Sequence, residues 1–118
     1  MKKKFLFVCV GNSCRSQMAE AIARNMGYEA LSAGTKPAEM VHPHTIKVLK
    51  IKNIKVDGLK PKHIDSIEIT EKMTVISMGC GVECPNIKID KDLGLEDPEK
   101  MEDYIETAEE IENFLKGL

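Results

Sequence analysis

The stretch VCVGNSCRS, residues Val8–Ser16, is the most informative part of this 118-residue chain for predicting its fold. It ends the apolar run FLFVCV at residues 5–10, which is typical of a buried parallel strand. It leads into SQMAEAIARNM at residues 16–26, where apolar residues recur with helical spacing. The sequence therefore predicts a strand, a loop that contains a glycine, and a helix in direct succession.

The stretch places Cys9 at the end of the predicted strand and Arg15 at the start of the predicted helix. A thiol reacts as its thiolate, which a helix N-terminus and a nearby guanidinium both favour. The amides of the loop between them can surround a tetrahedral oxyanion together with the planar fork of Arg15. Gly11 and Asn12 tolerate the positive φ angles of a curled loop, and the Ser16 hydroxyl can donate to the Cys9 thiolate. The stretch lacks the GxxxxGK[ST] pattern of a nucleotide-binding loop.

Strands and helices are predicted to alternate along the whole chain. Strands are expected at residues 4–9, 28–33, 73–78 and, more weakly, 87–89, and helices at residues 16–26, 43–53 and 98–116. Asp97 is expected to cap the last helix, with Pro98 in its first turn. The pattern predicts one α/β domain, residues 1–118, with a central four-stranded parallel sheet flanked by helices in three layers. Its site is expected beyond the carboxyl ends of the strands.

Composition narrows the class of protein further. The chain is 42% hydrophobic and 31% charged with a formal net charge of −2, so it lacks the positive field of a nucleic-acid-binding protein. No apolar run approaches the roughly 18 residues of a membrane helix, and no signal peptide is recognisable, so a cytoplasmic protein without a membrane partner is expected. Four cysteines in such a protein favour redox or metal chemistry over structural disulfides.

The string CVGNSCRSQMAEA, residues 9–21, resembles the signature of the low-molecular-weight tyrosine phosphatase superfamily. SQMAE is similar to its thioredoxin-coupled arsenate reductase branch. The resemblance continues through LSAGT at residues 31–35, MGCGVECP at residues 78–85 and GLEDP at residues 94–98. It therefore covers nearly the whole chain in the expected order, and it implies the phosphatase-like fold of that superfamily.

The resemblance implies a role for each reactive residue of the first motif. Cys9 is the expected nucleophile towards phosphorus or arsenic, and Asp97 is the expected acid that protonates the leaving oxygen, with Glu96 as the alternative. The expected oxyanion-binding residues are Val10, Gly11, Asn12, Ser13, Cys14, Arg15 and Ser16. No cofactor and no metal ion are implied for this reaction. Cys14 is expected to pack beside the nucleophile, where it can also form a protective disulfide with Cys9.

Two further thiols favour reduction over hydrolysis. Cys80 follows the third predicted strand, and adjacent strands lie about 4.8 Å apart, close to the Cα separation of a disulfide. The expected relay forms a Cys9–Cys80 disulfide as arsenite leaves and then a Cys80–Cys84 disulfide, which a thioredoxin-like reductant opens. The order in which Cys80 and Cys84 attack stays open because only three residues separate them. Such an enzyme would confer arsenic resistance.

A phosphatase that hydrolyses phosphomonoesters is the alternative function, since it needs only Cys9, Arg15 and an acid. Phosphatases of this superfamily resemble one another in having aromatic residues after Asp-Pro. Here Pro98 is followed by Glu99-Lys100-Met101, and the chain has no tryptophan. A pocket without aromatic walls is therefore expected, which suits a small inorganic anion better than a phosphotyrosine.

Three other functions are less consistent with the sequence. A zinc site from Cys80, Cys84 and two of the three histidines (His42, His44 and His63) fits common ligand spacings poorly, so the histidines are expected at the surface or as helix caps. Some relatives hold a potassium ion near the loop, but Lys60 and Lys62 make that segment unsuited to a cation. An inactive oxyanion-binding module is disfavoured because every reactive group is present.

Overall fold

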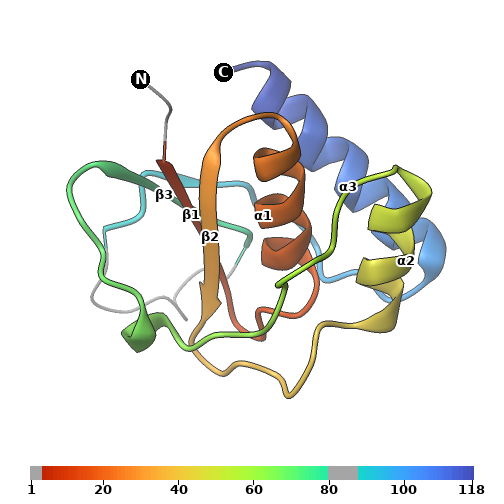
Figure 1. Ribbon diagram of the computed structural model, residues 1–118, viewed down its shortest axis with the longest axis horizontal. Coiled ribbons are helices and arrows are strands. Elements are labelled where there is room, and N and C mark those ends of the chain that lie inside the picture. Colours follow the sequence, from red (N-terminus) through yellow and green to blue (C-terminus); the bar gives the residue numbers. More distant parts are fainter. Residues whose placement is uncertain (1–3, 80–87) are drawn as a thin grey trace.

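The computed structural model describes residues 4–79 and 88–118 and shows an α/β domain (Figure 1). Four strands form one parallel sheet in the order β2-β1-β3-β4. The strands are β1 (Lys4–Cys9), β2 (Glu29–Gly34), β3 (Met73–Ser77) and β4 (Lys91–Asp92). The helices are α1 (Arg15–Asn25), α2 (Pro43–Ile51), the 3₁₀ helix η1 (Ile64–Ser66) and α3 (Met101–Lys116). The predicted four-stranded parallel sheet is confirmed.

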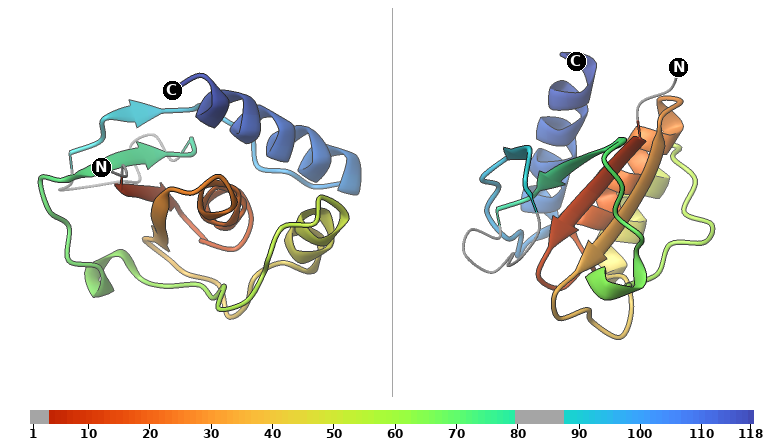
Figure 2. Two further views of the ribbon diagram at one scale, coloured as in Figure 1. Left: turned by 45° about the horizontal axis from the view of Figure 1, so that its top comes forward. Right: turned by 90° about the vertical axis from the view of Figure 1, so that its left-hand side faces the viewer.

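The layers follow from which side chains the strands bury. The larger core includes Phe5 and Phe7 of β1 with Ile22 of α1 and Ile111 of α3, on the face that the three α-helices cover. The smaller core lies on the other face, where Ile64 and other apolar residues of the η1 segment pack against β1 and β3. Figure 2 shows η1 and the α-helices on opposite sides of the sheet. The second outer layer is therefore thin.

The fourth strand lies later in the chain than the predicted residues 87–89, of which residue 87 is outside the described residues. β4 consists of the exposed residues Lys91 and Asp92, which pair with Ile76 and Ser77 of β3. Ile89 lies outside the strand and is half-buried against the smaller core, which accounts for an apolar residue at this position. A short apolar run has no periodicity of its own, so it does not distinguish a strand from another buried segment.

The last helix starts later than predicted. α3 begins at Met101, because the Asp103 carboxylate accepts the N–H groups of Lys100 and Glu99 at 3.0 and 3.2 Å. These hydrogen bonds hold the pKa of Asp103 below its ordinary value. Asp97 therefore does not cap the helix, and the expectation that it does so was wrong.

Parallel strands bring several segments together at their carboxyl ends. Cys9 is the register partner of Gly34 in β2, and Val8 is the partner of Ser77 in β3. The loops that follow β1, β2 and β3 thus leave the sheet at the same edge, as expected for the site of such a fold. No helix in the described part of the chain has the length and apolar character needed to span a bilayer.

Candidate active site

The Cys9 side chain is buried at the C-terminal end of β1, where it is 3% exposed. Its Sγ lies 2.8 Å from Ser16 Oγ and accepts the N–H of Asn12 at 3.1 Å. The Asn12 side chain donates to Ser16 Oγ at 2.7 Å, so the serine hydroxyl is left to donate to the sulfur. Two donors converging on one sulfur stabilise its anionic form.

The loop between β1 and α1 is held from outside by the segment that follows β2. The N–H groups of Lys36, Ala38 and His42 donate to the carbonyls of Val10, Gly11 and Ser13 at 2.9, 2.9 and 3.0 Å. Thr45, in the first turn of α2, adds a hydroxyl hydrogen bond of 3.0 Å to the Ser13 carbonyl. With three carbonyls bonded outward, the amides of the loop are free to face the pocket, which is the arrangement that an oxyanion requires.

Asn12 sets the curvature of this loop. It has a φ of 48°, the left-handed conformation expected of the loop, whereas Gly11 does not have a positive φ. The Asn12 side chain is fully buried, and its Oδ1 accepts from Lys62 N–H at 2.8 Å and from Gln17 Nε2 at 3.1 Å. Neither partner was recognised from the sequence, because both are brought to Asn12 only by the fold.

Arg15 joins three segments at the pocket. Its Nη1 donates to the carbonyls of Met78 and Leu95 at 3.0 and 2.7 Å, and its Nε lies 3.9 Å from Asp97 Oδ1. Because Nη1 carries both carbonyl contacts, the edge formed by Nε and Nη2 makes no hydrogen bond with the described residues and can form a bidentate contact with an oxyanion. The side chain is 12% exposed, so a charge bound there would be poorly screened by solvent.

The pocket above this loop has a volume of about 440 Å³. It is lined by Cys9, Val10, Gly11, Asn12, Ser13, Cys14, Arg15, His42, Asp97, Pro98, Glu99 and Tyr104. Asp97 is among the lining residues and Glu96 is not, which favours Asp97 over its neighbour as the acid. The Asp97 side chain is 76% exposed, so it stands at the mouth, where a leaving group would exit.

One wall of this pocket is aromatic, contrary to the expectation of a pocket without aromatic walls. The rings of His42 and Tyr104 stack with centroids 5.2 Å apart, and both residues line the cavity. Tyr104 lies in the first turn of α3, several residues beyond the Asp-Pro pair, and was seen in the sequence only as part of the helix's apolar stripe. The lining of the pocket therefore includes aromatic side chains beside the groups that face an oxyanion.

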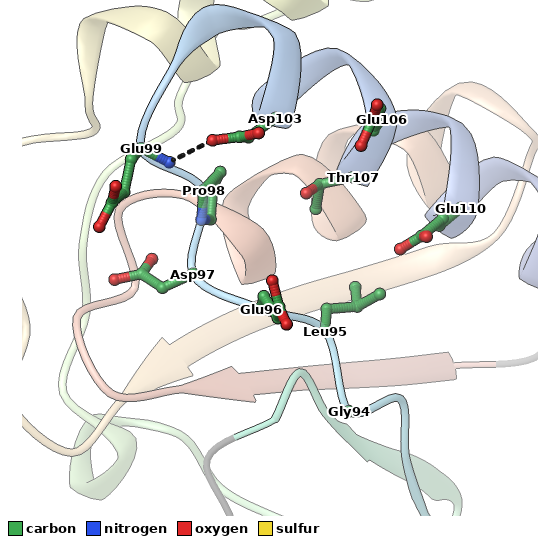
Figure 3. Close-up of a pocket in the computed structure, with 10 residues that line it drawn as sticks. All are labelled: Gly94, Leu95, Glu96, Asp97, Pro98, Glu99, Asp103, Glu106, Thr107 and Glu110. Carbon is green, nitrogen blue, oxygen red and sulfur yellow. Dashed lines mark hydrogen bonds between the residues drawn. The ribbon is translucent and has the colours of Figure 1, made fainter.

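A second cavity of about 510 Å³ adjoins the first and is strongly acidic. Figure 3 shows carboxylates from α3 and from the segment before it along this groove: Glu96, Asp97, Glu99, Asp103, Glu106 and Glu110. Asp97 and Glu99 belong to both cavities. The negative charge of the groove disfavours acidic phosphopeptides.

Lys62 occupies the region beside the loop in which a cation was considered. Its ammonium lies 3.4 Å from Glu20 Oε1, and it donates to the Lys60 carbonyl at 3.0 Å. Glu20 is fully buried and also contacts Arg24 Nη1 at 3.0 Å and the Ser32 hydroxyl at 2.8 Å. The protein thus supplies its own positive charge to this carboxylate.

The histidines and the two later cysteines are the remaining residues that the sequence analysis singled out. His42 Nδ1 accepts the His44 N–H at the start of α2, and His63 Nδ1 accepts the Asp65 N–H at the start of η1, so two histidines are helix caps. Cys80 and Cys84 lie outside the described residues. Within residues 4–79 and 88–118, no three His, Cys, Asp or Glu side chains gather closely enough to hold a metal ion.

A buried thiol that receives two donors, a loop whose carbonyls are bonded outward and a guanidinium at the pocket define a cysteine-dependent enzyme acting on tetrahedral oxyanions. The sequence profile of the family described as low molecular weight phosphotyrosine protein phosphatase matches residues 4–118. The chain belongs to this family, and within it to the arsenate reductase branch.

Similarity to arsenate reductases, in sequence and in structure, places the chain in that branch. A glutaredoxin arsenate reductase of Synechocystis is 36% identical over 104 residues, which cover 82% of this chain and 79% of the relative. The structure of an arsenate reductase in its phosphate-binding state matches with a TM-score of 0.86 and 32% identity, covering 99% and 95% of the two chains. A thioredoxin-dependent arsenate reductase of Corynebacterium glutamicum matches with a TM-score of 0.75 and 31% identity, covering 98% of this chain and 61% of the other.

Gly34, at the end of β2, lies directly against the backbone of the loop after β1. A methyl group at this position would lie 2.4 Å from the Val10 carbonyl oxygen and 3.0 Å from that of Cys9. Because both obstacles are backbone, Gly34→Ala should displace the loop and destabilise the protein by about 1–3 kcal/mol. We expect phosphate affinity to fall at least about tenfold, equivalent to about 1.4 kcal/mol, as measured by isothermal titration calorimetry.

Gly117→Ala is the matched control for this prediction. A methyl group there meets only ordinary contacts of 3.5 Å at the end of α3, far along the chain from the loop. It should leave phosphate affinity unchanged. Equal affinities in the two variants would show that the loop does not depend on its outer support.

Proposed function

We propose that this protein reduces arsenate to arsenite through Cys9. The observation that carries the proposal is the geometry at Cys9, where the sulfur receives Ser16 and Asn12 donors inside a loop that ends in Arg15. The same geometry binds phosphate or arsenate, since both are tetrahedral oxyanions of similar charge. The names of the relatives favour arsenate as the substrate.

In the proposed first step the Cys9 thiolate attacks arsenic, and one arsenate oxygen leaves as water after receiving a proton from Asp97. The loop amides and the Nε–Nη2 edge of Arg15 hold the other oxygens. An arsenic–oxygen bond is thus exchanged for a sulfur–arsenic bond, and the oxidation state of arsenic does not change. The exposed position of Asp97 allows it to regain its proton from solvent.

Two electrons then come from thiols. A Cys80 thiolate attacks Cys9 Sγ, and arsenic departs with the electron pair of the sulfur–arsenic bond as arsenite. Cys84 attacks Cys80 in the resulting disulfide, which frees Cys9 as a thiolate. An external dithiol of the thioredoxin or glutaredoxin type reduces the Cys80–Cys84 disulfide and so closes the cycle.

Hydrolysis of aryl phosphates is the second candidate activity, and the stacked rings of His42 and Tyr104 are the observation that favours it. It uses Cys9, Arg15 and Asp97, with water resolving the phosphocysteine. The acidic groove beside the pocket weighs against phosphopeptides as its substrates.

Parallel assays on the unaltered protein test the proposal. Arsenate reduction is followed as NADPH consumption with thioredoxin and its reductase or with glutaredoxin and glutathione, beside hydrolysis of p-nitrophenyl phosphate. We expect reduction to be the faster reaction at equal substrate concentration. Hydrolysis without any arsenate reduction by either reductant would assign the protein as a phosphatase.

A further inference from the structure

A second thiol, Cys14, shares the pocket with the nucleophile but has no part in the proposed relay. Its Sγ lies 3.2 Å from the hydroxyl of Tyr104 and 3.5 Å from that of Ser13. The Cys9 sulfur is bonded to other groups, the Ser16 hydroxyl and the Asn12 amide. The two thiols of the loop are therefore held by different partners.

Tyr104 is fixed in the position from which it reaches Cys14. The residue is 2% exposed, its ring stacks on His42 with an interplanar angle of 30°, and it forms a T-shaped pair with His44, with the ring centroids 5.2 Å apart. Burial, and next the hydrogen bond to Cys14, raise the pKa of Tyr104 far above its ordinary value. The phenol therefore keeps its proton, and the hydroxyl is available both as a donor and as an acceptor.

The Cys14 thiol can compete with Cys80 for attack on Cys9. If the Cys14 thiolate attacks Cys9 Sγ in the arsenic adduct, the sulfur–arsenic bond breaks and arsenic leaves with the electron pair as arsenite. A Cys9–Cys14 disulfide forms inside the loop. The electrons balance as in the relay, but the nucleophile ends in a buried disulfide before Cys80 has acted.

We propose that Tyr104 is a positioning residue that holds the Cys14 thiol away from the redox chemistry of Cys9. If Cys14 donates its proton to the phenol oxygen, it stays a thiol and is not nucleophilic. If it accepts the phenol proton, the sulfur must break that hydrogen bond before it can attack. In both arrangements the Tyr104 hydroxyl slows the attack of Cys14 on Cys9. For the reaction with arsenate, this role of Tyr104 rests on the proposed function.

Hydrogen peroxide tests the assignment without arsenate. In the Cys80→Ser, Cys84→Ser background only Cys9 and Cys14 remain of the four cysteines. Peroxide converts the Cys9 thiolate to a sulfenic acid with loss of hydroxide, and attack by Cys14 expels a second hydroxide to give the disulfide. We expect Tyr104→Phe to form this disulfide about five- to tenfold faster, the effect of one lost hydrogen bond, as measured by intact mass after alkylation.

Tyr28→Phe is the matched control, because it removes the hydroxyl of the only other tyrosine, whose ring packs on Phe5. Site-resolved iodoacetamide rates separate positioning from general loosening of the structure. Tyr104→Phe should speed alkylation of Cys14 and leave that of Cys9 unchanged, whereas loosening would alter both. Disulfide formation at the same rate in Tyr104→Phe and Tyr28→Phe would overturn the assignment.

Arsenate provides the second arm in the chain with all four cysteines. After one turnover without reductant, Tyr104→Phe should raise the share of Cys9–Cys14 disulfide about five- to tenfold over that in Tyr28→Phe. An unchanged share would overturn the assignment for the reductase reaction. Failure of every variant to form arsenite, with the peroxide difference intact, would contradict the proposed function and leave the role of Tyr104 standing.

Discussion

Cys9→Ser should abolish both arsenate reduction and aryl phosphate hydrolysis, with a loss of at least about 10⁴-fold. The serine hydroxyl keeps the size of the side chain and the Ser16 contact, but it is a far weaker nucleophile than a thiolate. Phosphate binding should survive and even tighten, because replacing the thiolate removes a negative charge that faces the bound oxyanion. Calorimetric titration with phosphate, beside the two activity assays, measures both effects on one sample.

Arg15→Lys is the matched comparison for this variant. An ammonium cannot reproduce the bidentate edge of the guanidinium, nor its two contacts with the Met78 and Leu95 carbonyls. We therefore expect weaker phosphate binding here, in contrast with Cys9→Ser. Substantial turnover by Cys9→Ser would show that another group is the nucleophile.

Asp97→Asn should slow the chemical step by roughly 10²–10⁴-fold with little loss of ground-state phosphate affinity. The amide keeps the shape of the side chain but cannot protonate a leaving oxygen. Its position at the pocket mouth, 3.9 Å from Arg15 Nε, is where that proton is needed. Pre-steady-state release of p-nitrophenol isolates this step from later ones.

Glu96→Gln is the control, because it removes the same charge one residue earlier. Glu96 lines the acidic groove but not the catalytic pocket, so this variant should leave the burst rate within about twofold, the size of a distant charge effect. A larger effect from Glu96→Gln than from Asp97→Asn would show that Glu96, and not Asp97, is the acid.

The order of strands and helices was readable from local patterns. The alternation of buried strands and amphipathic helices predicted β1, β2, β3 and the three α-helices to within a few residues. The exceptions are β4, which has two exposed residues, and the start of α3. In both places the deciding interactions are hydrogen bonds, to a neighbouring strand or to the Asp103 carboxylate, which hydrophobic periodicity does not report.

The loop after β1 was recognisable because its reactive residues are contiguous in sequence. What supports it was not, since the partners of Asn12 and Ser13 come from distant segments such as Lys62 and Thr45. Tyr104 was missed as a pocket residue for a similar reason. It follows the helical period of α3, and only the fold shows that its hydroxyl ends at Cys14. A polar-tipped aromatic one turn into a helix that begins near an Asp-Pro pair is the signal that could have indicated it.

A single-turnover experiment shows whether the protein's own thiols reduce arsenate. The reduced protein is mixed with arsenate and no reductant, quenched, and analysed for arsenite, free thiols and disulfide connectivity. We expect each chain to form one arsenite and lose two thiols. The unaltered protein should contain a Cys80–Cys84 disulfide, and Cys84→Ser should trap a Cys9–Cys80 disulfide. Undiminished arsenite formation over repeated turnovers in the Cys80→Ser, Cys84→Ser double variant would contradict this expectation.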